Sequence, residues 1–142
     1  MATAMSDAQW RAFLGHGTRT GKLATTRADG SPHVMPIWFV LDGDDLVFNT
    51  GATSVKGRNL ARDPRATVCV DEETPPYAFV TVRGSVTISE DLESMLEWST
   101  RIAERYMGAE LAGEYGARNA APGELLVRLR VEKVIGFTGV AS

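Results

Sequence analysis

Apolar and polar residues alternate along much of this chain, a pattern typical of β-strands that bury one face. Between residues 22 and 50 the alternating runs are separated by Asp29-Gly30 and Asp42-Gly43. Asp-Gly pairs favour tight hairpin turns, so this stretch predicts a meander of three antiparallel strands. Further runs predict three more strands, at residues 66–73, 77–90 and 125–137.

Helical periodicity occurs in only a few places. Residues 6–15 predict a short amphipathic helix, because Ser6 and Gln9 have the spacing of a capping box. Residues 90–107 predict one long amphipathic helix, with Gly108 suited to its C-terminal cap. The apolar face of that helix is expected to hold Leu92, Met95, Leu96, Ser99, Ile102, Ala103 and Tyr106. Residues 109–123 have weak periodicity and predict a loop with room for one helical turn.

Six strands and few helices, all joined by turns, predict an antiparallel barrel. The Thr74-Pro75-Pro76 segment separates two of the strands, since proline cannot continue a ladder. No linker, repeat or low-complexity segment divides the chain. We therefore expect residues 1–142 to form a single domain.

Composition narrows the classes of partner. The net charge is -3 and no basic stripe is present, which disfavours nucleic acid. The longest uncharged apolar stretch, VMPIWFVL, is too short to span a bilayer, and no signal sequence opens the chain. We expect a cytoplasmic protein with no membrane partner. The single cysteine, Cys69, lies in an apolar run and is expected to be a buried, inert thiol.

The familiar catalytic motifs are missing from the sequence. His16 and His33 belong to no metal-binding or nucleophile motif, and each is expected to be a surface or capping histidine. The acidic residues cluster in turns and at strand exits, where they usually solvate a loop. No protein nucleophile or metal site is therefore expected. If the protein is an enzyme, a cofactor carries its chemistry.

Residues 47–64, VFNTGATSVKGRNLARDP, form the most informative junction. A strand gives way to small hydroxyl residues and then to a short helix that opens with Lys56 and Arg58. Backbone amides, hydroxyl groups and cations together favour a bound anion, such as the phosphate of a flavin-like cofactor. The alternative is ordinary helix capping by Ser54 or Thr53, with both cations solvated.

The run HVMPIWF, residues 33–39, is the second candidate element. Pro36 interrupts a strand that otherwise has the pattern of a central one, which frees ladder groups for the polar edge of a planar ring. Trp38 or Phe39 is expected to line the pocket, but not both, since neighbouring strand residues face opposite ways. Core packing is the alternative for either ring.

In order along the chain, GKLATTRADGSPHVMPIWF, VFNTGATSVKGRNLARDPRATVCVD and YAFVTVRGSV resemble the split β-barrel flavin and deazaflavin oxidoreductases related to pyridoxamine 5'-phosphate oxidase. The likeness covers roughly residues 10–140, and its most specific part is the K-x-R-N-L-x-x-D-P-R pattern at residues 56–65. The chain is most similar to the actinobacterial branch that uses coenzyme F420.

That resemblance implies a mainly β fold with flanking helices, a six-stranded antiparallel split β-barrel. It also implies a homodimer with cofactor sites at the subunit interface. Lys56 and Asn59, helped by Thr50 and Ser54, would hold the phosphate region, and residues 35–38 would flank the ring. The full set of expected cofactor-binding residues is Met35, Pro36, Ile37, Trp38, Asn49, Thr50, Ser54, Lys56, Arg58 and Asn59.

Two departures from the family pattern bear on the cofactor. Pyridoxamine phosphate oxidases carry an arginine and a lysine in the strand that grips the phosphate of FMN, and VMPIWFVL contains no cation. This weakens the case for FMN. Close deazaflavin relatives often carry an extra basic residue where this chain has Ser54, which leaves a less cationic site.

The expected function is therefore an F420H2-dependent reductase that transfers a hydride to a conjugated small-molecule acceptor. One alternative keeps the fold and uses FMN, as an oxidase or reductase. A second is a non-catalytic protein that binds flavin, deazaflavin or haem. A third is a dimer that has lost its ligand and serves a structural role.

Overall fold

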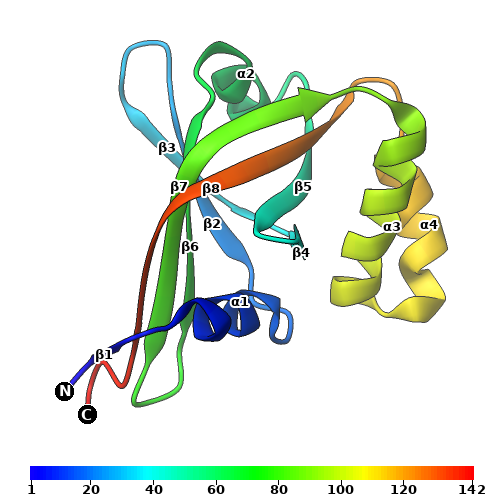
Figure 1. Cartoon of the computed structure of the whole chain (residues 1–142). Helices are drawn as coiled ribbons and strands as arrows, with labels where there is room; N and C mark the ends of the chain where they lie inside the picture. Colours follow the sequence, from blue (N-terminus) through cyan, green and yellow to red (C-terminus); the bar gives the residue numbers. More distant parts are fainter.

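A single antiparallel sheet dominates the computed structural model, which describes residues 1–142. Its strand order is β3-β2-β6-β7-β8-β5-β4, with β1 added beside β8 (Figure 1). The strands are β1 (Thr3–Ala4), β2 (Gly21–Thr26), β3 (Pro32–Ile37), β4 (Val40–Asp42), β5 (Asp45–Gly51), β6 (Arg65–Glu72), β7 (Ala78–Ser89) and β8 (Glu124–Thr138).

The six long strands lie where the alternation predicts them, and the split-barrel fold class is confirmed. Two short strands, β1 and β4, were not predicted, so the sheet has eight strands. The predicted meander is wrong, because β3 pairs only with β2 while β5 pairs with β4 and β8. Alternation specifies which face of a strand is buried but not which strand lies beside it.

The two ends of the strand order, β3 and β4, are consecutive in the chain. Only Trp38 and Phe39 separate them, and the structure has no ladder between them. At this corner the chain runs directly from β3 into β4, and no hydrogen bonds between strands close the barrel there. Pro36 sits in an edge strand and not in a central one, which is where a residue without an N–H group is tolerated.

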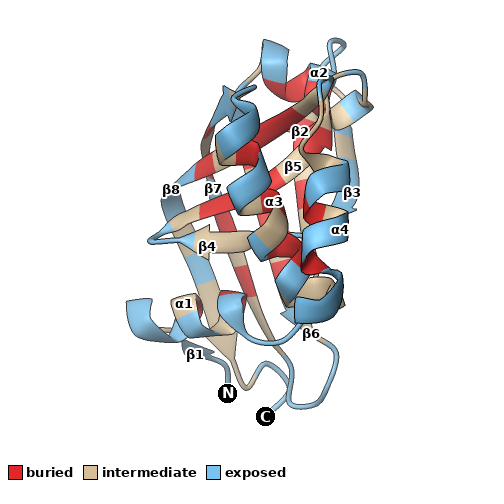
Figure 2. Ribbon diagram, turned by 90° about the vertical axis from the view of Figure 1, so that its right-hand side faces the viewer, coloured by how far each residue is buried: buried red, intermediate tan, exposed pale blue.

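Buried residues recur along the strands, as the burial colours show (Figure 2), and their side chains form the core of the barrel. Leu23, Phe39, Phe48 and Val82 are fully buried there. A smaller cluster of Val47, Met95 and Leu126 packs on the opposite face of β5 and β8, beneath the helix α3 (Leu92–Met107). Both faces of β5 are thus covered, which fixes the strand that leads into the candidate site.

The chain has four helices, with α1 and α2 at opposite ends of the barrel and α3 and α4 together on one side (Figure 1). The helix α1 (Asp7–Gly15) begins with the predicted capping box, in which Ser6 and Gln9 each accept the other's backbone N–H. The helix α2 (Val55–Arg62) covers one end of the barrel. On α3 the predicted apolar face is partly wrong, because Leu92 and Leu96 are exposed. No helix is long and apolar enough to cross a membrane. A cytoplasmic location stays a prediction.

The segment predicted as a loop at residues 109–123 is instead mostly helix, α4 (Ala109–Asn119). Its glycines lower the intrinsic helix propensity and hide the periodicity. Tertiary packing outweighs that weakness, because Gly116 lets α4 approach α3 closely. A Cβ atom on Gly116 would lie 2.3 Å from Thr100 Oγ1.

Candidate cofactor site

The helix α2 begins with a complete side-chain cap. Ser54 Oγ accepts the Gly57 N–H at 3.0 Å and donates to the Gly51 carbonyl at 2.7 Å. Because its one hydrogen is used in that way, Ser54 Oγ accepts from Thr50 Oγ1, which lies 2.9 Å away. The capping interpretation of Ser54 is confirmed. Thr50 and Ser54 brace the turn, while Thr53 is exposed.

Gly57 brings this first turn close to the end of β5. A Cβ atom at Gly57 would lie 2.2 Å from the Gly51 carbonyl oxygen, well inside any normal contact. Only glycine therefore permits the observed approach. The backbone amides at the start of α2 are held in place by the strand that precedes them.

The helix carries three cations and no acid in its eight residues. Lys56 is half-buried and Arg58 is exposed, and neither makes an ion pair or a side-chain hydrogen bond. The positive end of the helix dipole adds to their field. No carboxylate neutralises the two side chains, so the arrangement favours an anion.

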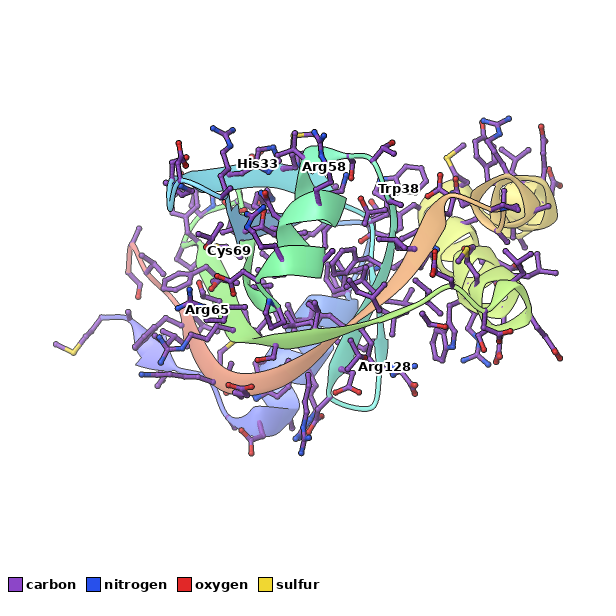
Figure 3. The ribbon with its side chains drawn as sticks, turned by 90° about the horizontal axis from the view of Figure 1, so that it is seen from above. His33, Trp38, Arg58, Arg65, Cys69 and Arg128 are labelled. Carbon is purple, nitrogen blue, oxygen red and sulfur yellow. The ribbon has the colours of Figure 1, made fainter.

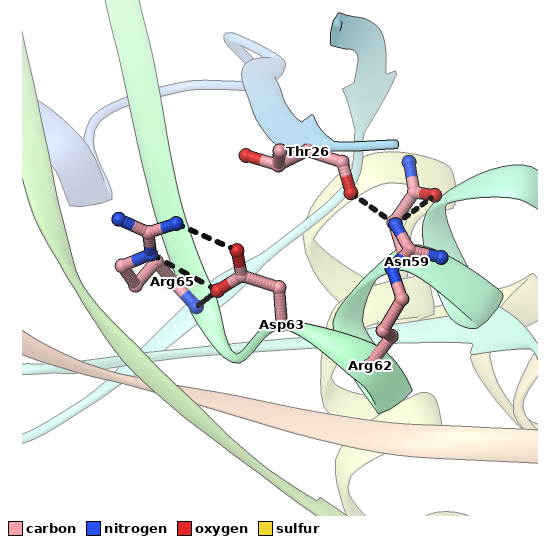
Figure 4. A network of polar contacts seen from close by, with 5 residues as sticks. All are labelled: Thr26, Asn59, Arg62, Asp63 and Arg65. Atoms are coloured by element: carbon pink, nitrogen blue, oxygen red, sulfur yellow. Dashed lines mark hydrogen bonds and ion pairs between the residues drawn. The ribbon is translucent and has the colours of Figure 1, made fainter. Parts of the chain in front are cut away.

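The side chain of Asn59 attaches α2 to β2 by a hydrogen bond (Figure 4). Its Nδ2 donates to Thr25 Oγ1 at 3.0 Å, and its Oδ1 accepts from Arg62 at 3.2 Å. Arg62 also donates to the Thr26 carbonyl. Asn59 is buried, so its amide contributes to the site by holding the helix in position.

The helix ends in a second polar contact, also drawn in Figure 4. Asp63 accepts from the backbone N–H of Arg65 and pairs with its guanidinium, with a closest distance of 2.8 Å. The hydrogen bonds from Arg65 lower the pKa of Asp63 to about 2. Within the D-P-R segment this contact stabilises the turn that leads from α2 into β6.

Asn49 does not join this group, because neighbouring residues on β5 face opposite ways. Its Oδ1 accepts from Ser99 of α3 at 2.9 Å. Its Nδ2 is buried and has no hydrogen-bond partner. Asn49 therefore lies on the helix side of the sheet, while Thr50 faces the barrel.

The expected ring-binding residues lie on β3 and at the corner that follows it. Met35 and Trp38 are 42% and 38% exposed, and Pro36 is exposed as well, whereas Ile37 points into the core. In the view down onto α2, His33, Arg58 and Trp38 follow one another along one side of the molecule (Figure 3). Arg58 of α2 and the exposed residues of β3 and its corner thus face the same side, with Trp38 at the end of β3 that is farther from α2.

Two features of β3 and the corner that follows it were not predicted. Trp38 stacks on Tyr106 of α3, with ring centroids 5.0 Å apart and planes 3° from parallel. His33 is half-buried, and its Nδ1 atom has no partner. The helical period places Tyr106 on the buried face of α3, but no local signal identifies the ring that it contacts.

The largest surface hollow, about 500 Å³, lies elsewhere, on the outer face of β2, β6 and β7. Arg65, Thr67 and Arg83 line it, and none of the expected site residues does. Cys69 is only half-buried, contrary to the prediction, because it alternates with the buried Val68 and Val70.

Comparison with known proteins adds independent information. The family model for pyridoxamine 5'-phosphate oxidase matches residues 6–137. An F420H2-dependent biliverdin reductase from Mycobacterium tuberculosis is 22% identical over 114 residues, which make up 80% of this chain and 76% of the relative.

Solved structures share the fold. The conserved hypothetical protein Rv2991 from Mycobacterium tuberculosis has a TM-score of 0.83 and 27% identity, over 95% of this chain and 86% of the other. An F420 reductase has a TM-score of 0.71 and 27% identity, over 87% and 94% of the two chains. A haem storage protein from Vibrio cholerae and an FAD-binding protein from Mesorhizobium loti have TM-scores of 0.74 and 0.69, but at 20% and 22% identity the likeness concerns the fold alone.

Proposed function

The chain belongs to the pyridoxamine 5'-phosphate oxidase family, and we propose that it is an F420H2-dependent reductase acting on a conjugated small-molecule acceptor. The similarity to an F420H2-dependent biliverdin reductase and to an F420 reductase supports this choice within the family. The acceptor is proposed to be a conjugated small molecule, because the relatives of this chain include a reductase that acts on biliverdin.

The observation that carries the proposal is the pair of unpaired cations at α2. Lys56 and Arg58 extend from a helix without acidic residues, next to a capped and tightly braced N-terminus. A phosphodiester would accept from Lys56 and from the first backbone amides. These residues fit the anionic part of the cofactor.

The second requirement is a surface for a flat ring. Met35 and Trp38 leave apolar area exposed on β3 and at the corner that follows it, Val55 does so at the start of α2, and a planar conjugated group would cover part of this area. β3 is an edge strand, so its outer backbone groups are free to hydrogen-bond with the polar rim of a ring. The residues present therefore fit both parts of a deazaflavin cofactor.

When bound, the reduced deazaflavin supplies a hydride from its C5 carbon. The chain's own residues would hold the phosphate at α2, orient the ring beside β3 and exclude bulk water. Proximity and orientation of this kind supply on the order of 7–11 kcal/mol of a reaction barrier. No protein nucleophile is required.

We also propose that the functional unit is a homodimer with its sites at the interface. The outer face of β2, β6 and β7 is not covered by any helix of the chain (Figure 1). This face also contains the 500 Å³ hollow. A second copy related by a two-fold axis would cover that face. Analytical ultracentrifugation tests this: a 15.4 kDa monomer at micromolar concentration would contradict it.

The cofactor is tested by titrating the purified protein with oxidised F420 and, in a separate series, with FMN. Quenching of the ligand's fluorescence gives each dissociation constant. Tight binding of F420 with weak or no binding of FMN supports the proposal. Preference for FMN would replace it with a flavin oxidase or reductase, and a Soret band on reconstitution with haem, without F420 binding, would replace it with a haem-binding protein.

A further inference from the structure

The stacked pair of Trp38 and Tyr106 joins two elements that are far apart in the chain. Trp38 follows the edge strand β3, and Tyr106 lies in the last turn of α3. Their rings are 3° from parallel at a centroid distance of 5.0 Å, which is an offset stack. No other aromatic ring stacks on Trp38, and the residue is still 38% exposed. Tyr106 covers one face of the indole, and the exposed area of the residue leaves room for a second ring.

Tyr106 is itself held firmly. Its hydroxyl donates to the Arg19 carbonyl at 2.9 Å and accepts the Phe39 N–H at 3.3 Å. The neighbouring Arg105 donates to the Phe39 carbonyl at 2.7 Å. The last turn of α3 thus binds both backbone groups of the residue that follows Trp38.

The hydrogen bonds from the end of α3 also reach α1 and the residues that follow it. Arg105 also donates to the Leu14 and Gly17 carbonyls, at 2.7 and 2.9 Å. Its guanidinium lies 5.0 Å from the centre of the Tyr106 ring. Burial raises the pKa of Tyr106, so the phenol keeps its proton and both hydrogen bonds at neutral pH. The barrel corner, α1 and α3 therefore form one rigid unit around this phenol.

From this geometry we infer that Tyr106 is a positioning residue, which holds the indole of Trp38 as a rigid platform for the planar ring of the bound cofactor. This inference rests on the function proposed above. An exposed indole that is fixed before binding loses little conformational freedom when a second ring packs on it. The ring of Tyr106 supplies the support, and its hydroxyl supplies stability to the corner.

These two roles are separable by substitution. Tyr106→Phe keeps the stacked ring but loses both hydrogen bonds of the hydroxyl. Tyr106→Leu loses the ring as well. Tyr115→Leu is the matched control, because Tyr115 is a half-buried tyrosine of α4 whose ring contacts a guanidinium, that of Arg118, and no aromatic ring.

Three quantities are measured for each variant: the dissociation constant of F420, the urea midpoint, and acrylamide quenching of indole emission without ligand. Tyr106→Leu is expected to bind F420 about 2- to 12-fold more weakly, the range for one aromatic stack, and to show increased quenching. Tyr106→Phe is expected to bind within about twofold of the wild type, although its urea midpoint falls. Tyr115→Leu is expected to leave affinity and quenching unchanged.

The outcomes separate this inference from the proposed function. If the wild type binds F420 and Tyr106→Leu binds it equally well, the inference is overturned and the function stands. Equal losses of affinity in Tyr106→Phe and Tyr106→Leu, or in Tyr115→Leu, would assign the effect to stability and also overturn it. If the wild type binds neither F420 nor FMN, the proposed function fails and the inference fails with it.

Discussion

Replacing Gly57 by alanine tests whether the start of α2 depends on its close approach to β5. The new Cβ atom would lie 2.2 Å from the Gly51 carbonyl oxygen, so the first turn has to move outward by about 1 Å. Overpacking of this kind costs about 1–3 kcal/mol. The better helix propensity of alanine returns about 1 kcal/mol. We expect a net loss of up to about 2 kcal/mol in the free energy of unfolding.

The displacement also weakens the hydrogen bond from Gly57 to Ser54, so the F420 dissociation constant should rise by roughly tenfold. Urea denaturation and fluorescence titration measure the two effects. Gly51→Ala is the matched control, because no atom lies within 4 Å of its Cβ position and both quantities should stay near wild type. A Gly57→Ala variant that is as stable and as tightly binding as Gly51→Ala would refute the reasoning.

Two further predictions concern the scaffold. Arg19 and Thr74 hold the pKa of Glu72 at about 2, so the carboxylate stabilises the fold above its ordinary pKa and this contribution is lost as the pH falls toward 2. The urea midpoints of wild type and Glu72→Gln should therefore differ above pH 5 and converge near pH 2, and a gap that is constant with pH would contradict this. In α4, the clash of Gly116→Ala with α3 costs about 1–3 kcal/mol and the helix propensity of alanine offsets about 1 kcal/mol, so the free energy of unfolding should fall by up to about 2 kcal/mol. Gly113→Ala, which meets no neighbouring atom, should instead raise it by up to about 1 kcal/mol. Urea denaturation measures both, and equal stability of the two variants would argue against close packing of α3 and α4.

Most of the fold features that were predicted correctly depend on local sequence pattern. The alternation in β6, β7 and β8 and the capping box at Ser6 depend on residues near one another in the chain, and each was predicted correctly. The partners of β3 and β5 were not, because pairing is decided by how the whole barrel closes. α4 was missed because its stability comes from packing against α3 and not from intrinsic propensity.

In the candidate site, too, local features follow from the sequence, whereas contacts between residues far apart in the chain do not. The strand-to-helix junction and the cap at Ser54 follow from local sequence, and so does the pair of cations on α2. The contact between Trp38 and Tyr106 joins residues that are far apart in the chain, and no local pattern reports it. Asn49 shows a further limit, since its position beside Thr50 in sequence places it on the opposite face of β5.

The central claim is that α2 binds the anionic part of the cofactor through Lys56, and the most direct test compares F420 affinity in Lys56→Ala and Arg27→Ala. Each variant removes one cation that makes no ion pair, but Arg27 lies in the turn between β2 and β3. A charge-assisted contact is worth about 1.5–3 kcal/mol, so Lys56→Ala should bind F420 at least about tenfold more weakly than wild type. Arg27→Ala should stay within about twofold of wild type, because Arg27 is an exposed charge outside α2 that acts on the site only through salt-screened solvent. Equal affinities of Lys56→Ala and Arg27→Ala would contradict the claim.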